Sequence, residues 1–171
     1  MADIKAIKGT DGTTYNLRDD YSIWGGENLL LNVKKTNAPA VYLAAAYTLS
    51  EPLVAGETYT LQYWFTNSGR TATCPYVGGG SLNIGTWVAI TNDSTYYCYT
   101  FSPTASMASA SQFINIYAST TGTTQGSTAI SGTFTVTKAK LEKGHKATDW
   151  TPCYKDIFTY DSTNSQLVVN L

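Results

Sequence analysis

The sequence predicts an all-β fold, a sandwich or a barrel, and three observations predict it. Many short segments rich in Thr, Tyr, Val and Ile follow one another between turn residues. No segment carries sustained helical periodicity. Charged residues make up only 13% of the 171 residues, so Thr, Ser, Asn, Gly and Tyr must cover much of the surface, and these residues suit strands and turns.

The chain opens with an expected β-hairpin. Residues 4–8 and 13–17 read as strands, and the Asp11-Gly12 pair between them is a strong turn signal. Because a lone hairpin is marginal in water, we expect this one to dock on the main domain, a sister chain or another protein. Residues 19–26 read as a linker, so residues 1–26 form an N-terminal extension.

The middle of the chain, residues 27–152, is expected to be one β-sandwich domain. The expected strands are 28–33, 40–49, 58–66, 71–77, 86–90, 95–102, 112–118 and 132–142. Side chains alternate between the faces of a strand. Strand 58–66 therefore turns Tyr59, Leu61, Tyr63 and Phe65 to the core and strand 112–118 turns Ile114 and Ile116. Gln62 and Trp64 on the first strand, and Asn115 and Tyr117 on the second, then face away from the core.

The tail, residues 153–171, is expected to form a second hairpin. Residues 157–160 and 166–171 read as strands around the turn-rich stretch 161–165. An apolar strand near the end of a chain is an aggregation hazard unless its edge is paired. Both terminal hairpins thus point to oligomerisation or to docking in an assembly.

Charge and targeting signals exclude several classes of partner. The net charge is -1 with 11 Lys and Arg residues in no dense patch, which argues against nucleic acid. No signal peptide opens the sequence, and no apolar run is long enough to cross a membrane. We therefore expect a protein that is made in the cytoplasm and leaves it by another route, such as cell lysis.

The sequence offers little chemistry for catalysis or for metal binding. The single histidine, His145, follows Gly144 in an expected turn and has no nucleophile or base beside it. No GxSxG, HExxH or P-loop motif occurs, and no carboxylate pair stands out for glycosidase work. Glu27 and Asp149 could contribute to a structural calcium site, but the spacing of a calcium loop is missing. We predict no enzyme, no cofactor and no metal.

The three cysteines form neither a disulfide framework nor a zinc site. Their number is odd, and no CxxC spacing occurs among Cys74, Cys98 and Cys153. Cys98 lies on an expected strand between two tyrosines, where a reduced residue would pack well. A single bridge between Cys74 and Cys98 remains an open alternative.

The most specific motif is the run AKLEKGHKATDWTP at residues 139–152. It resembles the closing signature of jelly-roll domains, similar to carbohydrate-binding modules, that occur in phage tail and structural proteins. Residues 27–32 and 56–64 resemble the opening and central strands of the same domains, so the resemblance covers roughly residues 28–152. Residues 7–19 look like a segment that begins tail, baseplate and head-fibre proteins of phages.

The resemblance implies a jelly-roll-like β-sandwich in a bacteriophage virion protein. Such components are often trimeric, so a homotrimer is expected, with the N-terminal hairpin contacting other virion proteins and the sandwich outermost. Host cell-surface glycans are a further expected partner. Whether the chain belongs to a head or a tail stays open. The alternatives are a free carbohydrate-binding module of a bacterial host, which would need a signal peptide, and a glycan-active enzyme.

Candidate glycan-binding residues follow from how such modules recognise sugars. Aromatic rings stack on pyranose faces, while amides and Arg bond the hydroxyls. The outward-facing aromatic and amide pairs supply the first candidates, and loops or strand edges supply the rest: Trp64, Gln62, Asn115, Tyr117, Trp87, Tyr76 and Arg70. The alternative is that these rings pack under a loop or against a neighbouring chain. Trp150 of the closing motif is expected to pack its indole against the sandwich edge.

Overall fold

The computed structural model describes residues 6–8, 14–16, 26–33, 42–78, 82–110, 112–125, 130–161 and 166–169. For the two terminal hairpins and residues 154 and 157, it describes the backbone alone. No helix within these ranges is long and apolar enough to cross a membrane.

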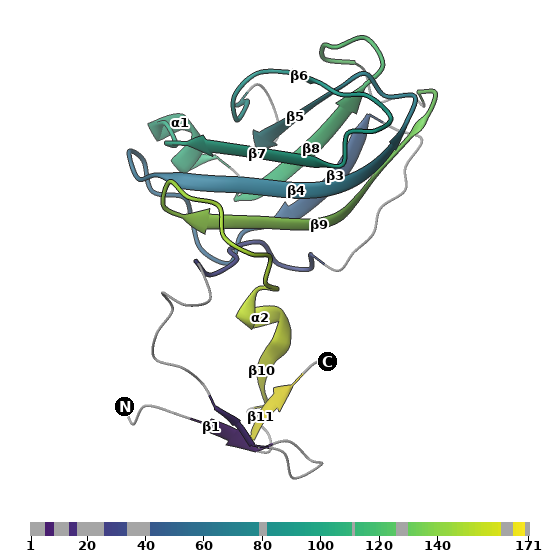
Figure 1. Ribbon diagram of the computed structural model, residues 1–171. Helices are drawn as coiled ribbons and strands as arrows, with labels where there is room; N and C mark the ends of the chain where they lie inside the picture. Colours follow the sequence, from purple (N-terminus) through teal and green to yellow (C-terminus); the bar gives the residue numbers. More distant parts are fainter. Residues whose placement is uncertain are drawn as a thin grey trace.

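Two antiparallel sheets packed face to face make the molecule an all-β sandwich, as predicted. One sheet has four strands in the order β3-β8-β5-β6, and the other has three in the order β7-β4-β9. In Figure 1, β7, β4 and β9 run across the sandwich while β3, β8 and β5 cross behind them. The strands are β3 Leu43–Thr48, β4 Tyr59–Ser68, β5 Ala72–Val77, β6 Val88–Ala89, β7 Tyr96–Phe101, β8 Phe113–Ser119 and β9 Thr133–Lys143.

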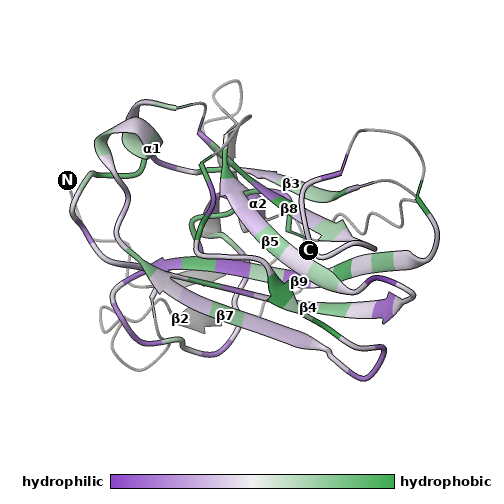
Figure 2. Cartoon of the chain, turned by 90° about the horizontal axis from the view of Figure 1, so that it is seen from above, coloured by the Kyte–Doolittle hydropathy of each residue, from purple (hydrophilic) through white to green (hydrophobic). Residues whose placement is uncertain are grey.

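Alternation along the strands builds the core between the sheets. The four apolar side chains of β4 predicted to face inward are 0–2% exposed, and Ile114 and Ile116 of β8 are fully buried opposite them. Figure 2 shows the alternation as green and purple bands along the strands. Each such side chain contributes about 1.5–3 kcal/mol of burial free energy, so this pattern decides which face of each sheet turns inward.

The expected first strand, residues 28–33, is instead a short connection between the two sheets. The Leu29 N–H donates to the Leu141 carbonyl at 2.7 Å, and Leu30 forms an isolated bridge with Leu49. Asn32 has a φ of 59°, which ends the extended conformation. The segment therefore touches β9 on one side and the end of β3 on the other.

Two short helices were not predicted. Helix α1, Ala105–Ser109, begins after Thr104, whose Oγ1 accepts a hydrogen bond from the Met107 N–H at 3.2 Å. Helix α2 is Tyr154–Ile157. Helices of four or five residues are too short to show a 3.6-residue period, so the sequence pattern could not reveal them.

Both terminal hairpins form as predicted. Strand β1 (Ala6–Lys8) pairs with β2 (Thr14–Asn16), and β10 (Phe158–Asp161) pairs with β11 (Gln166–Val169), each antiparallel. Figure 1 shows both hairpins beyond the same end of the sandwich. The turn at Asp11-Gly12 and most of the linker at 19–26 lie outside the described residues. The boundaries drawn at residues 26 and 152 stay predictions.

Candidate binding faces of the sandwich

The structure places the predicted site residues on two opposite outer faces. Gln62 and Trp64 belong to β4 and therefore to the sheet β7-β4-β9, whose outer surface we name the three-strand face. Asn115 and Tyr117 belong to β8 and to the sheet β3-β8-β5-β6, whose outer surface we name the four-strand face. The core lies between them, so the two aromatic and amide pairs do not line one groove.

A buried ion pair dominates the three-strand face. Lys140 and Glu142 lie two residues apart on β9, and their charged groups are 3.3 Å apart with side chains 0% and 1% exposed. The Lys140 ammonium also donates to Thr148 Oγ1 at 2.7 Å and to the Asp149 carbonyl at 2.8 Å. Burial lowers the pKa of Lys140, and the Glu142 carboxylate partly opposes that shift.

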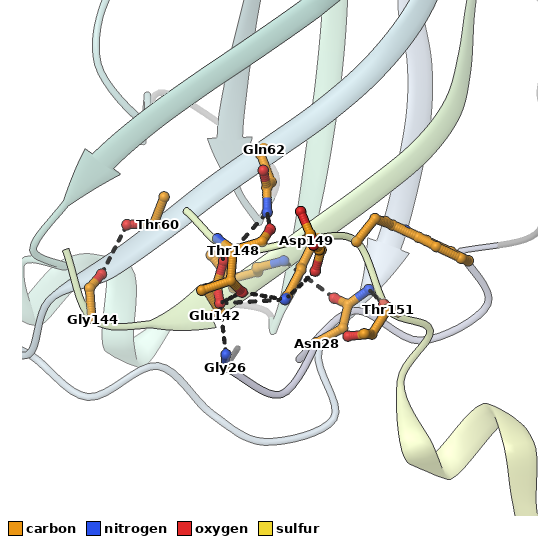
Figure 3. A network of polar contacts seen from close by, with 12 residues as sticks. Gly26, Asn28, Thr60, Gln62, Glu142, Gly144, Thr148, Asp149 and Thr151 are labelled. Atoms are coloured by element: carbon orange, nitrogen blue, oxygen red, sulfur yellow. Dashed lines mark hydrogen bonds and ion pairs between the residues drawn. The ribbon is translucent and has the colours of Figure 1, made fainter. Parts of the chain in front are cut away.

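Gln62 is part of the same network. Glu142 accepts hydrogen bonds from the Gly26 N–H at 3.0 Å, the Thr148 N–H at 2.9 Å and the Gln62 amide at 3.3 Å. The Gln62 amide also donates to the Thr148 carbonyl at 2.6 Å, and its oxygen accepts from the Tyr96 hydroxyl at 3.0 Å. Figure 3 shows these contacts around Glu142. Gln62 faces away from the core as predicted, but the chain itself covers it.

The closing motif is anchored from both ends. The Asn28 amide donates to the Ala139 carbonyl at 3.0 Å and to the Thr151 carbonyl at 2.9 Å. The Trp150 indole donates to the Ala139 carbonyl at 3.0 Å and packs against the core, which confirms its predicted position. Lys138 lies over that indole, 5.4 Å from the ring centre. Residues 144–152 thus form a cover held over β9.

One aromatic pair stays partly open on the three-strand face. Trp64 is half-buried and stands 5.1 Å, ring centre to ring centre, from Tyr96, which is 45% exposed. The Tyr96 hydroxyl already donates to Gln62, so this pair offers ring surface to a ligand and few free polar groups.

The four-strand face carries a closed circuit of four aromatic rings, which we name the ring cluster. Tyr42 lies 4.5 Å from Tyr117 and 5.9 Å from Trp87. Tyr76 completes the circuit at 5.0 Å from Tyr117 and 6.4 Å from Trp87. Tyr117 and Trp87 are half-buried, whereas Tyr42 and Tyr76 are 7% and 5% exposed. Cys74, on the same side of β5 as Tyr76, is fully buried.

Asn115 lies beside the ring cluster with half of its amide unused. Its nitrogen donates to the Gly78 carbonyl at 3.1 Å and to the Tyr117 hydroxyl at 3.2 Å. Its oxygen is buried and has no hydrogen-bond partner, although the residue is only 5% exposed. A buried acceptor without a donor costs about 1–3 kcal/mol. The oxygen has almost no solvent-accessible surface, so a ligand hydroxyl could donate to it only after neighbouring side chains moved aside.

Tyr42 was missed by the sequence analysis. Burial raises its pKa to about 12, and side-chain and backbone hydrogen bonds tie its hydroxyl to Thr124 and Gln125. A β-bulge between Leu43 and Ala45 shifts the register of β3 against β8. Simple alternation along residues 40–49 therefore could not assign the direction of Tyr42. Its aromatic character at the start of an expected strand was the available signal.

Arg70 is buried where the strands of the four-strand sheet end, and its proposed sugar contact stays a prediction. The residue is 2% exposed, and its guanidinium donates to the Ala118 carbonyl at 3.3 Å and the Gly132 carbonyl at 3.1 Å. It joins the ends of β5 and β8 to the turn before β9. A side chain held in this way supports the fold.

The alternative of a Cys74–Cys98 bridge is wrong. All three cysteines are free, with Cys74 and Cys153 buried and Cys98 exposed. Cys74 lies under the ring cluster, whereas Cys98 pairs in register with Gln62 on the opposite sheet. Burial raises the pKa of the Cys74 thiol to about 11.

The described residues show no cluster of side chains in the pattern of a metal site. Within the described ranges, no group of three or more His, Cys, Asp or Glu residues could hold a metal ion. His145 is exposed, as expected for a turn residue. Burial raises the pKa of the Glu27 carboxyl above its ordinary value, and the nearby Glu51 charge raises it further.

Comparisons with known proteins do not establish a function for this chain. No protein-family model matches the sequence, and no curated protein does. One solved structure, the EclA C-terminal domain, a sugar-binding protein, aligns with a TM-score of 0.38 at 16% identity. The alignment covers 80% of this chain and 89% of that one.

Proposed function

We propose that this protein is a non-enzymatic structural component of a bacteriophage particle whose sandwich binds a glycan on the four-strand face. The phage part of the proposal is supported by the resemblance of residues 7–19 and 139–152 to segments of phage structural proteins. The glycan part is carried by one observation: the unpartnered Asn115 oxygen beside the ring cluster.

The ring cluster has the chemistry that sugar recognition requires. The apolar face of a pyranose stacks on an aromatic ring, and Trp87 and Tyr117 are only half-buried. Asn115 would supply the acceptor for a sugar hydroxyl beside the same cluster once the side chains over its buried oxygen moved aside. Tyr42 and Tyr76 are buried and hold the two half-buried rings in place.

Attachment to the particle forms the second part of the proposal. The N-terminal hairpin would contact other virion proteins, because its two strands make no sheet with the sandwich. The homotrimer expected from the resemblance stays a prediction. A free carbohydrate-binding module of a bacterial host would use the same four-strand face, and detection of the chain in purified particles separates the two.

Two tryptophan substitutions on opposite faces test the glycan part. We expect Trp87→Ala to weaken glycan binding by about tenfold or more, because a stacking contact contributes about 1 kcal/mol beyond burial. Trp64→Ala is the control, a second half-buried indole on the three-strand face, and should leave binding unchanged. The measurement is a glycan array with the wild type, followed by titration calorimetry with any saccharide it identifies.

The possible outcomes separate the hypotheses. If Trp64→Ala lost glycan binding and Trp87→Ala retained it, the site would be the Trp64–Tyr96 pair. An array on which the wild type binds nothing would reject glycan binding and leave a purely structural role.

A further inference from the structure

We infer that the free edge of strand β7 pairs with β7 of a second copy, antiparallel and about a two-fold axis at Cys98. The pairing would join two three-stranded sheets into one continuous sheet. It does not depend on the proposed glycan function. It also gives a dimer, and so departs from the homotrimer expected from the resemblance.

Strand β7 is a sheet edge that no other segment of the described residues joins by backbone hydrogen bonds. Edge strand β6 has only two residues. The Leu29 N–H donates to the Leu141 carbonyl on the edge of β9, and the Leu31 N–H donates to the Thr48 carbonyl at the end of β3. Strand β7 has six residues and pairs with β4 alone. An open edge of that length is a template for another strand.

The hydrogen-bond pattern shows which backbone groups are available. The Phe65 N–H donates to the Thr95 carbonyl at 3.0 Å, so the Thr95 backbone points toward β4. Residues of an antiparallel strand alternate between pointing to one neighbour and to the other. The backbone N–H and C=O groups of Tyr97, Tyr99 and Phe101 therefore also point to β4. Tyr96, Cys98 and Thr100 direct their N–H and C=O groups to the open edge.

The residues of β7 lack the features that usually protect an edge. The strand reads YYCYTF, with no charge, proline or glycine, and it has no register shift against β4. Tyr96 and Tyr99 are 45% and 40% exposed, and Cys98 is exposed. Natural edges are commonly blocked by Lys, Pro or a bulge. An aromatic, uncharged edge of this kind is suited to pairing with another strand.

A second copy is the occupant that matches this edge. A strand without charge can pair with itself, whereas like charges placed opposite each other would repel. A two-fold axis at Cys98 uses all three open residues, with Cys98 opposite Cys98 and Tyr96 opposite Thr100. Each large tyrosine then meets a small threonine, both of which are exposed in the single chain.

Substitutions at Cys98 test the pairing in the full-length protein. Cys98→Lys would place two ammonium groups directly opposite each other, whereas Cys98→Ser keeps a small, uncharged side chain. By light scattering at several concentrations under reducing conditions, we expect wild type and Cys98→Ser at twice the chain mass of 18.5 kDa. Cys98→Lys should be at the chain mass, with an unchanged far-UV spectrum and melting temperature at high dilution.

Cross-linking supplies a second readout of the register. Opposite residues in a hydrogen-bonded antiparallel pair lie about 5.5 Å apart at Cα, within the range of a disulfide. With oxidised glutathione as oxidant, two Cys98 thiols should form one bridge while glutathione is reduced, giving a covalent dimer absent from Cys98→Ser. A wild type that is monomeric or trimeric at every concentration would overturn the inference. So would a dimer that Cys98→Lys leaves intact.

Discussion

The two outer faces of the sandwich use similar residues in opposite ways. Each carries an amide beside aromatic rings, Gln62 near Trp64 and Tyr96 on one side and Asn115 near the ring cluster on the other. On the three-strand face the chain folds back over its own strand, and both ends of the Gln62 amide are bonded within the protein. On the four-strand face the Asn115 oxygen has no partner.

The difference shows that facing away from the core does not make a residue available to a ligand. Gln62 is 2% exposed and Asn115 is 5% exposed, so burial alone does not separate them. What separates them is whether the hydrogen-bonding capacity is used inside the protein. The three predictions below test this contrast, from the largest expected effect to the smallest.

Breaking the buried ion pair should have the largest effect. Lys140→Ala leaves the Glu142 carboxylate buried without its cation, and we expect the free energy of unfolding to fall by about 3–5 kcal/mol. The control is Lys143→Ala. Its ammonium lies 2.6 Å from Glu51 on the surface, where an ion pair contributes about 1 kcal/mol or less. Urea unfolding measures both. Equal losses in the two variants would contradict a structural role for the closing motif.

Alkaline pH should lower the free energy of unfolding through Cys74, which lies on the four-strand side of the molecule. The folded-state pKa of this thiol, about 11, lies above its ordinary value of 9, so the native state holds the proton more tightly. The stabilisation is fully present below pH 9 and is lost as pH rises toward 11, a decrease of about 3 kcal/mol. Cys74→Ala should remove this step.

The tyrosines provide an internal reference for that measurement. Burial raises the pKa of Tyr42 and of Tyr47 to about 12 from an ordinary value of 10, so a later decrease between pH 10 and 12 should persist in Cys74→Ala. Denaturant unfolding at a series of pH values resolves the two steps. A wild-type curve that stays flat from pH 9 to 10 would show that the ring cluster does not seal the thiol.

The two amides should differ in their effect on glycan affinity, with the smallest changes in stability. Gln62→Ala removes donors from Glu142 and from the Thr148 carbonyl, and should cost about 1–3 kcal/mol of stability without changing glycan affinity. Asn115→Ala removes the unused acceptor together with the donors to the Gly78 carbonyl and the Tyr117 hydroxyl, and should lower affinity by about fivefold with a comparable loss of stability. Calorimetric titration and thermal melting measure both variants. If Gln62→Ala lowered glycan affinity and Asn115→Ala left it unchanged, the site would lie on the three-strand face.

Local patterns predicted most of the strands and the inward faces. Alternation assigned Tyr59, Tyr63 and Ile116 to the core because the side-chain period of a strand is two residues. Alternation also placed Gln62 and Asn115 on non-core faces. It could not show that β4 and β8 belong to different sheets, because pairing between strands distant in sequence is decided by the whole fold.

The sequence by itself determined an all-β sandwich with two terminal hairpins, and it identified the closing motif that contains Lys140, Glu142 and Trp150. Only the tertiary structure decided that this motif covers the three-strand face, that Arg70 is buried between strand ends, and that Tyr42 joins Trp87 and Tyr117. The physical reason is the distance along the sequence over which each property is decided. Strand formation and facing depend on neighbours along the chain, whereas the satisfaction of a buried amide or charge depends on groups brought together from distant segments.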